Sequence, residues 1–445
     1  MAVPLWSSRP LRRLRALVRG RHWAPRMVFW GGAVLVGLSA VALTQLGNLA
    51  NARFSALYHH WPWAPFLVSP AGLILSLWLT RRFFPGAQGS GIPQVIAALS
   101  ERPGRARARL LSVRIAIGKI LLTTLGLFSG ASIGREGPTA HVGASCTAAA
   151  GRLAGINRPE LERALIIAGG GAGIAAAFNT PIAGIMFAIE ELARGFDERA
   201  SGTIIVTILL AGLTAVALEG NYTYFGVTRA ALHPAQWPLV PACGLIGGLA
   251  GGLFSRLVLD LSLRLRGTLA RHPYRLAGAV GLVIATLGVL SHGDSFGTGY
   301  PQARALVMGG AGLSWYFPLT KWLASLASYV SGIPGGLFAP ALATGAGLGA
   351  DIGRLFSGAP LQAAVILGMV SYLAGTVQTP ITAFVIVMEM TANNAMLFPL
   401  MAAAFIASLV SRLLCPEPIY QALAKRFVTP ADRHGALVTN YNGPA

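Results

Sequence analysis

A succession of apolar segments is the feature that most constrains this chain. About a dozen such segments, separated by short polar breaks, lie between Met27 and Cys415, and a helix needs about 20 apolar residues to cross the hydrocarbon core of a bilayer. Only 11% of the 445 residues are charged, whereas about a quarter are charged in a typical soluble domain. The 54% hydrophobic content excludes disorder, and three cysteines are too few for a disulfide scaffold. We therefore expect an all-α polytopic membrane protein.

The charged residues are unequally distributed and indicate an orientation. The net charge is +20, and residues 1–26 contain seven arginines and no acidic residue. A second basic cluster lies between Arg102 and Arg114. Short basic segments beside apolar spans typically face the cytosol and contact lipid headgroups. This pattern predicts cytosolic N- and C-termini in a lipid bilayer, and no motif supports a nucleic-acid partner.

Three apolar regions are interrupted by glycine and proline. These regions are Gly86–Pro93, Ser129–Pro138 and Ser331–Pro340. Backbone that is not helical cannot face lipid, because its N–H and C=O groups would lack partners, but it is tolerated inside protein or along a wet cavity. The interruptions therefore favour a transport path over a purely structural membrane scaffold.

The chain also repeats itself. Residues 178–190 match residues 377–389 at an offset of 199, and Ser129–Pro138 matches Ser331–Pro340 at an offset of 202. Two pairs with nearly equal offsets indicate a duplicated architecture whose halves meet near residue 230, and such repeats hold their substrate site at the interface between the halves. The expected organisation is a basic N-terminal segment (1–26), a first membrane repeat (27–230), a second membrane repeat (231–425) and a short cytosolic tail (426–445).

Each break precedes a run that can form a helix, so each should present a helix N-terminus. The first N–H groups of a helix have no partner within the helix, and together with the helix dipole they favour an anion. Gly89–Pro93, Gly134–Pro138 and Gly336–Pro340 could supply three such ends. Partial charges attract a small anion without trapping it, which suits an ion that must leave again.

The same three motifs resemble the signature sequences of the CLC chloride channel and transporter family, in that family's order. The resemblance covers about residues 30–425. It implies two inverted-topology repeats of tilted and broken helices, a homodimer with one pore per subunit, and chloride as the transported ion. It implies neither a cofactor nor a metal.

The resemblance also assigns an anion site. Ser90 matches the serine whose hydroxyl holds the central chloride, and Tyr420 matches the tyrosine that donates its phenol. The expected chloride-binding residues come from the three motifs and from the segment near residue 420. They are Ser90, Gly91, Arg135, Glu136, Gly137, Leu337, Phe338 and Tyr420.

Two glutamates are expected to handle protons. Glu136 matches the family's external gating glutamate, whose carboxylate occupies an anion position until protonation releases it. Glu191 matches the inner proton-transfer glutamate, although a solvated helix end beside Arg194 is the alternative. Glu190 and Glu389 are matched to each other by the repeat, which favours a structural role for both.

Lys119 is a lone cation in an apolar run, as a family lysine is. The acidic residues that often follow the first motif in the family are replaced here by Gln94 and its neighbours. Lys119 therefore lacks an obvious local counter-ion, and its electrostatic role stays open.

A chloride/proton antiporter of a prokaryotic inner membrane is the function that these features favour. A passive chloride channel of the same fold is the alternative, and a fluoride-specialised transporter is disfavoured because Ser90 is retained. An enzyme is not expected, since no nucleophile–base pair, metal motif or phosphate-binding loop is found.

Overall fold

The structure, a computed structural model, describes residues 23–194, 201–310, 313–356 and 358–428, and these are almost entirely helical. Within these ranges no β-strand forms, and only two isolated bridges occur, between Gly89 and Pro334 and between Gly134 and Gly336. Seven helical segments of the described residues are long and apolar enough to cross a membrane. The predicted all-α membrane fold is thus confirmed. Most of the basic N-terminal segment and of the tail lies outside the described residues.

The first half of the chain contains the elements up to residue 219. In chain order they are α2 (Trp23–His60), α3 (Pro65–Phe83), α4 (Ile92–Ser100), α5 (Arg105–Leu110), α6 (Val113–Phe128), α7 (Glu136–Leu153), α8 (Pro159–Phe178), α9 (Pro181–Phe187), the π-helical segment η1 (Ala188–Ala193) and α10 (Ser201–Glu219).

The second half begins with a short 3₁₀ turn. Its elements are η2 (Pro234–Gln236), α11 (Leu239–Arg264), α12 (Arg266–Arg271), α13 (Pro273–Leu290), α14 (Tyr300–Val307), α15 (Phe317–Val330), α16 (Phe338–Leu355), α17 (Leu361–Val377), α18 (Pro380–Thr391), α19 (Leu397–Leu414) and α20 (Ile419–Ala424).

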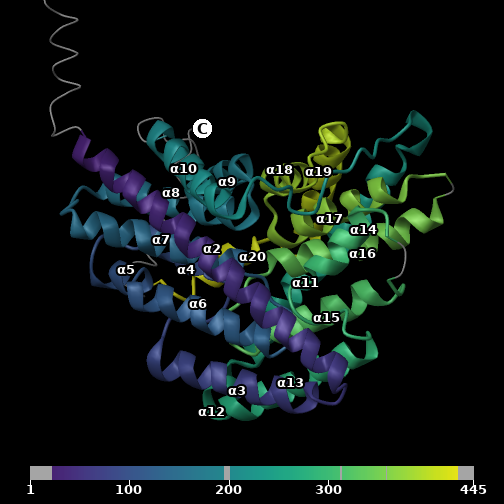
Figure 1. The fold of residues 1–445 in the computed structure, drawn as a ribbon, viewed down its shortest axis with the longest axis horizontal. Helices are drawn as coiled ribbons and strands as arrows, with labels where there is room; N and C mark the ends of the chain where they lie inside the picture. Colours follow the sequence, from purple (N-terminus) through teal and green to yellow (C-terminus); the bar gives the residue numbers. More distant parts are fainter. Residues whose placement is uncertain (1–22, 195–200, 311–312, 357, 429–445) are drawn as a thin grey trace, which may run out of the picture.

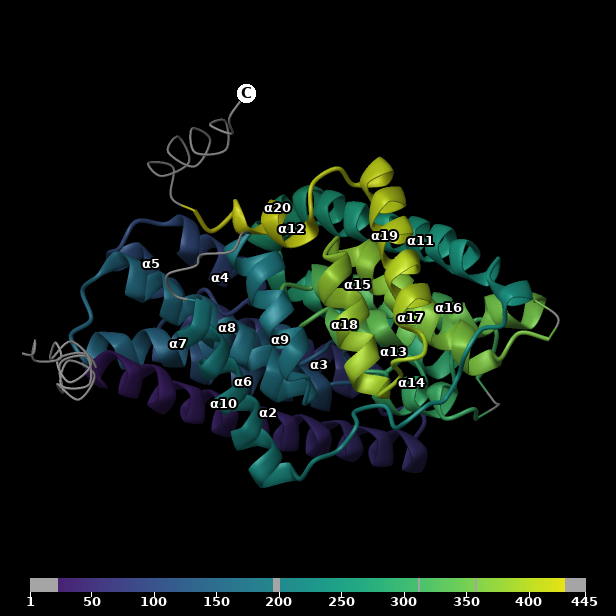
Figure 2. The same cartoon turned by 90° about the horizontal axis from the view of Figure 1, so that it is seen from above.

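The two halves lie side by side. Helices α4 to α10 occupy one side of the molecule and α14 to α19 the other, and the long helix α2 runs across the face seen in Figure 1. Figure 2 shows the same separation from above. The C-terminal helix α20 returns to the first half and packs against α4. Segments from both halves therefore meet near the middle of the molecule.

The repeat is visible in the closest helix packing. α7 packs against α8 in the first half, as α16 packs against α17 in the second. A Cβ on Gly143 would lie 2.2 Å from the carbonyl oxygen of Gly169, and a Cβ on Gly345 would lie 2.6 Å from that of Gly368. Only glycine permits this approach of two backbones, which is how helices associate where lipid supplies no hydrophobic driving force between them.

Glu190 and Glu389 join the two halves. The Glu190 carboxylate accepts bonds from the backbone N–H groups of Ile381 (3.1 Å) and Thr382 (2.6 Å) at the start of α18. Glu389 accepts from Ile182 (3.1 Å) and Ala183 (2.7 Å) at the start of α9. Each glutamate thus caps a helix of the other repeat and satisfies donors that a helix start leaves free. This geometry supports the structural role that the repeat favours for both.

Candidate anion site

Each of the three glycine- and proline-rich motifs ends at a helix start, as the sequence predicts. Helix α4 begins at Ile92, α7 at Glu136 and α16 at Phe338, and none of these starts is capped by the side chain of its N-cap residue. The N-cap of α4 is Gly91 with φ of 104°, a conformation that favours glycine. A Cβ there would also lie 2.7 Å from the Cβ of His141. Glycine at this position therefore lets the chain turn into α4 against α7.

The motifs of the two halves are hydrogen-bonded to each other. The N–H of Gly134 donates to the carbonyl of Gly336 (2.8 Å), and the N–H of Gly336 donates to that of Gly134 (2.7 Å). The N–H of Gly89 donates to Ile333 (3.1 Å), and that of Gly335 donates to Gly89 (3.1 Å). These four bonds hold the starts of α4, α7 and α16 together at the interface between the repeats.

The side chain of Glu136, the first residue of α7, reaches to the start of α16. Its side chain is fully buried, and Oε2 accepts a bond of 3.4 Å from the N–H of Ala339. Its other carboxylate oxygen, Oε1, has no hydrogen-bond partner. A carboxylate from the first repeat thus uses a helix-start donor of the second, where a helix terminus favours an anion.

Two buried hydroxyl groups indicate a ligand-binding site. Ser90 and Tyr420 are fully buried and their hydroxyls lie near each other, yet among the described residues neither Oγ of Ser90 nor Oη of Tyr420 has a hydrogen-bond partner of normal geometry. A Cβ on Gly137 would lie 2.2 Å from the Ser90 oxygen, which places this hydroxyl against α7. The Tyr420 ring stacks on that of Phe338, with ring centroids 6.2 Å apart and planes within 7°. Buried polar groups are rarely left unpaired, so unpaired donors beside open helix starts fit an anion.

The Arg135 side chain points elsewhere. Its guanidinium donates to the carbonyl of Thr44 (3.2 Å) and to Oδ1 of Asn48 (2.6 Å) on α2, and to the hydroxyl of Tyr224 (3.5 Å). Only the backbone of Arg135, the N-cap residue of α7, lies with the other predicted residues. The sequence pattern did not reveal these anchors, because they come from distant segments.

Lys119 has carbonyl partners in place of a counter-ion. Its fully buried ammonium donates to the carbonyl oxygens of Gly89 (2.5 Å) and Gln88 (3.4 Å) in the loop that carries Ser90. Gln94 also binds this loop, through the carbonyls of Gly86 (3.0 Å) and Gln88 (2.6 Å). Lys119 and Gln94 thus both fasten the loop that carries Ser90.

Glu191 lies inside the protein. Its side chain is 2% exposed and belongs to the π-helical segment η1, a distortion that the sequence did not predict. The side-chain amide of Gln421 lies beside the Glu191 carboxylate, and its oxygen accepts from Nη2 (3.2 Å) and Nε (3.1 Å) of Arg194. Because Gln421 follows Tyr420 on α20, one short helix contacts both Glu191 and the stacked ring of Phe338. The alternative of a solvated helix end does not describe this position.

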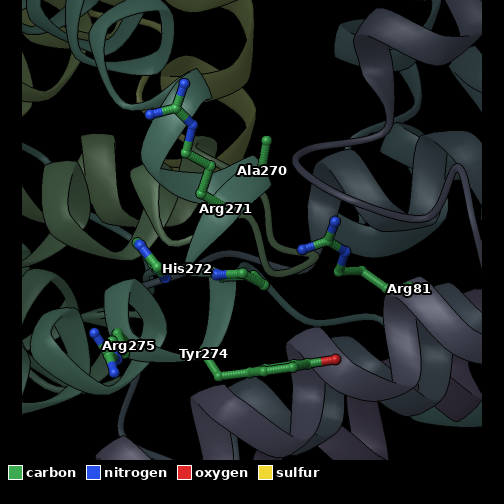
Figure 3. A pocket seen from close by; sticks show the side chains of 7 residues that line it. Arg81, Ala270, Arg271, His272, Tyr274 and Arg275 are labelled. Atoms are coloured by element: carbon green, nitrogen blue, oxygen red, sulfur yellow. The ribbon is translucent and has the colours of Figure 1, made fainter.

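A separate cavity lies away from these residues. Its volume is about 560 Å³, and its lining comes from the end of α3, from α12 and from the start of α13: Arg81, Ala270, Arg271, His272, Pro273, Tyr274 and Arg275. Figure 3 shows Arg81 reaching toward the α12–α13 segment from the opposite side, above the Tyr274 ring. None of the predicted site residues lines it. Among the described residues no group of histidine, cysteine and acidic side chains could hold a metal.

Comparison with known proteins identifies the family. The voltage gated chloride channel family model matches residues 72–412, which is more than half of the chain. The chain belongs to the voltage gated chloride channel (CLC) family.

Relatives within this family are described as exchangers. An H⁺/Cl⁻ exchange transporter ClcA from Salmonella schwarzengrund is 31% identical over 460 residues, covering 97% of this chain and 95% of the relative. The H⁺/Cl⁻ exchange transporter ClcA of Yersinia pseudotuberculosis is 31% identical over 422 residues, covering 90% of this chain and 85% of the relative. The crystal structure of a slow cyanobacterial Cl⁻/H⁺ antiporter has a TM-score of 0.77 at 26% identity, covering 91% of this chain and 96% of that one. A CLC-type fluoride/proton antiporter shares the fold, with a TM-score of 0.79 at 23% identity.

Proposed function

We propose that this protein exchanges chloride for protons across the membrane. The observation that carries the proposal is the buried Glu136 carboxylate at the start of α16, beside two buried hydroxyls without partners. The relatives named as H⁺/Cl⁻ exchangers, which cover nearly the whole chain, support the same reaction.

Glu136 is the external gate in this proposal. Its carboxylate and a chloride ion compete for the same N–H donors at the start of α16. Protonation removes the negative charge of Glu136, and with it the attraction to these donors. The side chain then leaves the position to chloride, so proton uptake and anion entry are coupled. Ser90 and Tyr420 bind the next anion inward, with the N–H groups of Leu337 and Phe338.

Glu191 is the proton acceptor on the inner side. Chloride occupies the path inward from Glu136, so a proton needs a route that partly leaves it. Glu191 is buried, and η1 carries it to Gln421, next to Tyr420. A buried acid in an apolar segment is expensive unless it has a function. Its presence favours exchange over the passive channel.

The remaining features of the proposal concern assembly and orientation. The protein is a homodimer with one pore per subunit in a prokaryotic inner membrane. Both termini face the cytosol, and the repeats comprise residues 27–230 and 231–425. The basic clusters of the sequence support this orientation.

Reconstituted liposomes test the function. The purified protein, placed under a chloride gradient, should move protons against their own gradient, which a pH electrode outside the vesicles records. Glu136→Gln and Glu136→Ala should abolish proton movement and leave chloride flux, because no titrating carboxylate contests the anion position. A wild-type protein that passes chloride without protons would favour the channel. Chloride-driven proton uptake that persists in either variant would remove Glu136 from the gate.

A further inference from the structure

A second buried lysine occupies the position in the second repeat that Lys119 occupies in the first. Lys321 lies 202 residues after Lys119, the offset that also relates the Ser129–Pro138 and Ser331–Pro340 motifs. The chain has three lysines, and these two are fully buried whereas Lys425 is exposed. A buried cation among membrane helices is costly and is usually retained for a function.

Lys321 also holds a loop through its carbonyls. Its ammonium donates to the carbonyl oxygens of Ser295 (3.0 Å), Phe296 (3.3 Å) and Gly297 (2.7 Å). An ammonium has three N–H donors, so these three bonds use them all. The Asp294 carboxylate, next to this loop, is close enough to interact with the ammonium through its opposite charge, although among the described residues no direct ion pair forms. Both lysines therefore act on a loop that leads into a short helix, α4 in the first repeat and α14 in the second.

The fit around this loop is tight. Gly299, the N-cap of α14, has φ of 77°. A Cβ on it would lie 2.8 Å from Cε of Lys321 and 2.5 Å from the Cβ of Ala343 on α16. The lysine stem, the loop and α16 are thus packed against one another. The three hydrogen bonds of the Lys321 ammonium therefore act directly on the loop that begins α14.

The start of α14 contacts the residues beside the gate. Tyr300 donates its hydroxyl to the carbonyl of Tyr224 (3.0 Å), and the two rings pack edge to face with centroids 4.9 Å apart. The hydroxyl of Tyr224 accepts from Arg135 (3.5 Å), the residue that precedes Glu136. The Tyr224 ring also packs against Phe178, which contacts Phe338 at the start of α16. A continuous set of contacts thus joins Lys321 to both helix starts around Glu136.

We infer that Lys321 is a positioning residue for the gate, acting through the loop 295–300, Tyr224 and Arg135. This inference rests on the proposed role of Glu136. In the first repeat, the lysine fastens the loop that carries the anion ligand Ser90. In the second, the equivalent lysine fastens the loop that holds the surroundings of the gating carboxylate. The two equivalent lysines therefore have different roles: Lys119 positions the anion ligand, and Lys321 positions the gate.

The test uses Lys321→Met, which keeps the length of the side chain and removes its donors and charge. Lys425→Met, at an exposed lysine paired with Glu417, is the matched control. Both changes are made in the wild-type protein and in the Glu136→Ala variant, and chloride flux and the proton-to-chloride ratio are measured in liposomes. In the wild-type background, Lys321→Met should lower the proton-to-chloride ratio, because the gating carboxylate is no longer held in position. In the Glu136→Ala background it should leave chloride flux unchanged, because no gate remains to be positioned.

Tyr300→Phe, which removes the hydroxyl bonded to Tyr224 and keeps the ring, gives an independent variant. It should lower the proton-to-chloride ratio in the same direction as Lys321→Met. Equal loss of flux from Lys321→Met in both backgrounds would mean that the lysine only supports the fold, and would overturn the inference. An unchanged ratio in both Lys321→Met and Tyr300→Phe would overturn it as well. A failure of the proposed function is recognised separately, since wild type and Glu136→Ala would then have the same ratio.

Discussion

Removing the unpaired hydroxyl of Ser90 or Tyr420 should weaken chloride binding and raise the free energy of unfolding of the chloride-free protein. Ser90→Ala and Tyr420→Phe each delete one buried donor and keep the rest of the side chain. Among the described residues neither hydroxyl has a hydrogen-bond partner of normal geometry, and the two hydroxyls lie near each other, so each deletion breaks no established hydrogen bond of the protein. The effects on folding and on chloride binding can therefore be separated.

Chloride binding should weaken. A hydrogen bond to a charged group is worth about 1.5–3 kcal/mol, which corresponds to a rise of about 10- to 150-fold in Kd for each variant. The free energy of unfolding in chloride-free buffer should rise, because a buried hydroxyl without a partner costs about 1–3 kcal/mol. The double variant excludes compensation by the remaining hydroxyl and should bind chloride least.

Calorimetric titration of the detergent-solubilised protein with chloride measures the first effect, and thermal unfolding with and without chloride measures the second. Ser371→Ala is the control, since Ser371 on α17 is also fully buried with an unpartnered hydroxyl but packs against Gly247 of α11. It should raise the unfolding temperature without changing the chloride Kd. If the double variant bound chloride as tightly as the wild type, the anion site would be misplaced. If Ser371→Ala weakened binding as much as Ser90→Ala, the reasoning from unpaired hydroxyls would be refuted.

Two further predictions concern the glutamates near the interface between the repeats. Glu191→Gln should still carry chloride but move no protons against a gradient in liposomes, because the amide keeps the size and cannot titrate; coupling equal to that of the wild type would exclude Glu191 from the proton path. Glu190→Ala and Glu389→Ala should each lower the free energy of unfolding, by about 0.5–2 kcal/mol, since each uncaps a helix start. The loss should be larger for Glu190, which also accepts from the Thr382 hydroxyl at 2.7 Å, and melting temperatures lowered equally would contradict this count of donors.

The sequence predicted those parts of the fold that local chemistry determines. Apolar segments indicated membrane helices, and glycine beside proline indicated the starts of α4, α7 and α16, because these residues act on the backbone of their own segment. The repeat offset indicated that the interrupted segments of the two halves correspond. Long-range pairings were not accessible in the same way. Hydrogen bonds such as those between Gly134 and Gly336 depend on how two distant backbones meet.

The sequence likewise revealed some side chains of the site but not their hydrogen-bond partners. The assignments of Ser90, Glu136 and Tyr420 came from motifs, and the structure brings these residues to one region. The partners of Arg135 and Lys119 could not be anticipated, because carbonyl groups carry no sequence signal. Lys321 could have been found by applying the offset of 202 to Lys119.

The placement of the cations bears on why this site suits an ion that must leave. Arg135 directs its charge to α2 and Tyr224, and Lys119 and Lys321 direct theirs to backbone carbonyls. All three positive charges are thus taken up by the protein itself and hold the segments that surround the site. The donors left for an anion are helix-start N–H groups and two neutral hydroxyls. Such partial charges attract chloride weakly enough that a single carboxylate, Glu136, can compete for them, which is the condition that exchange requires.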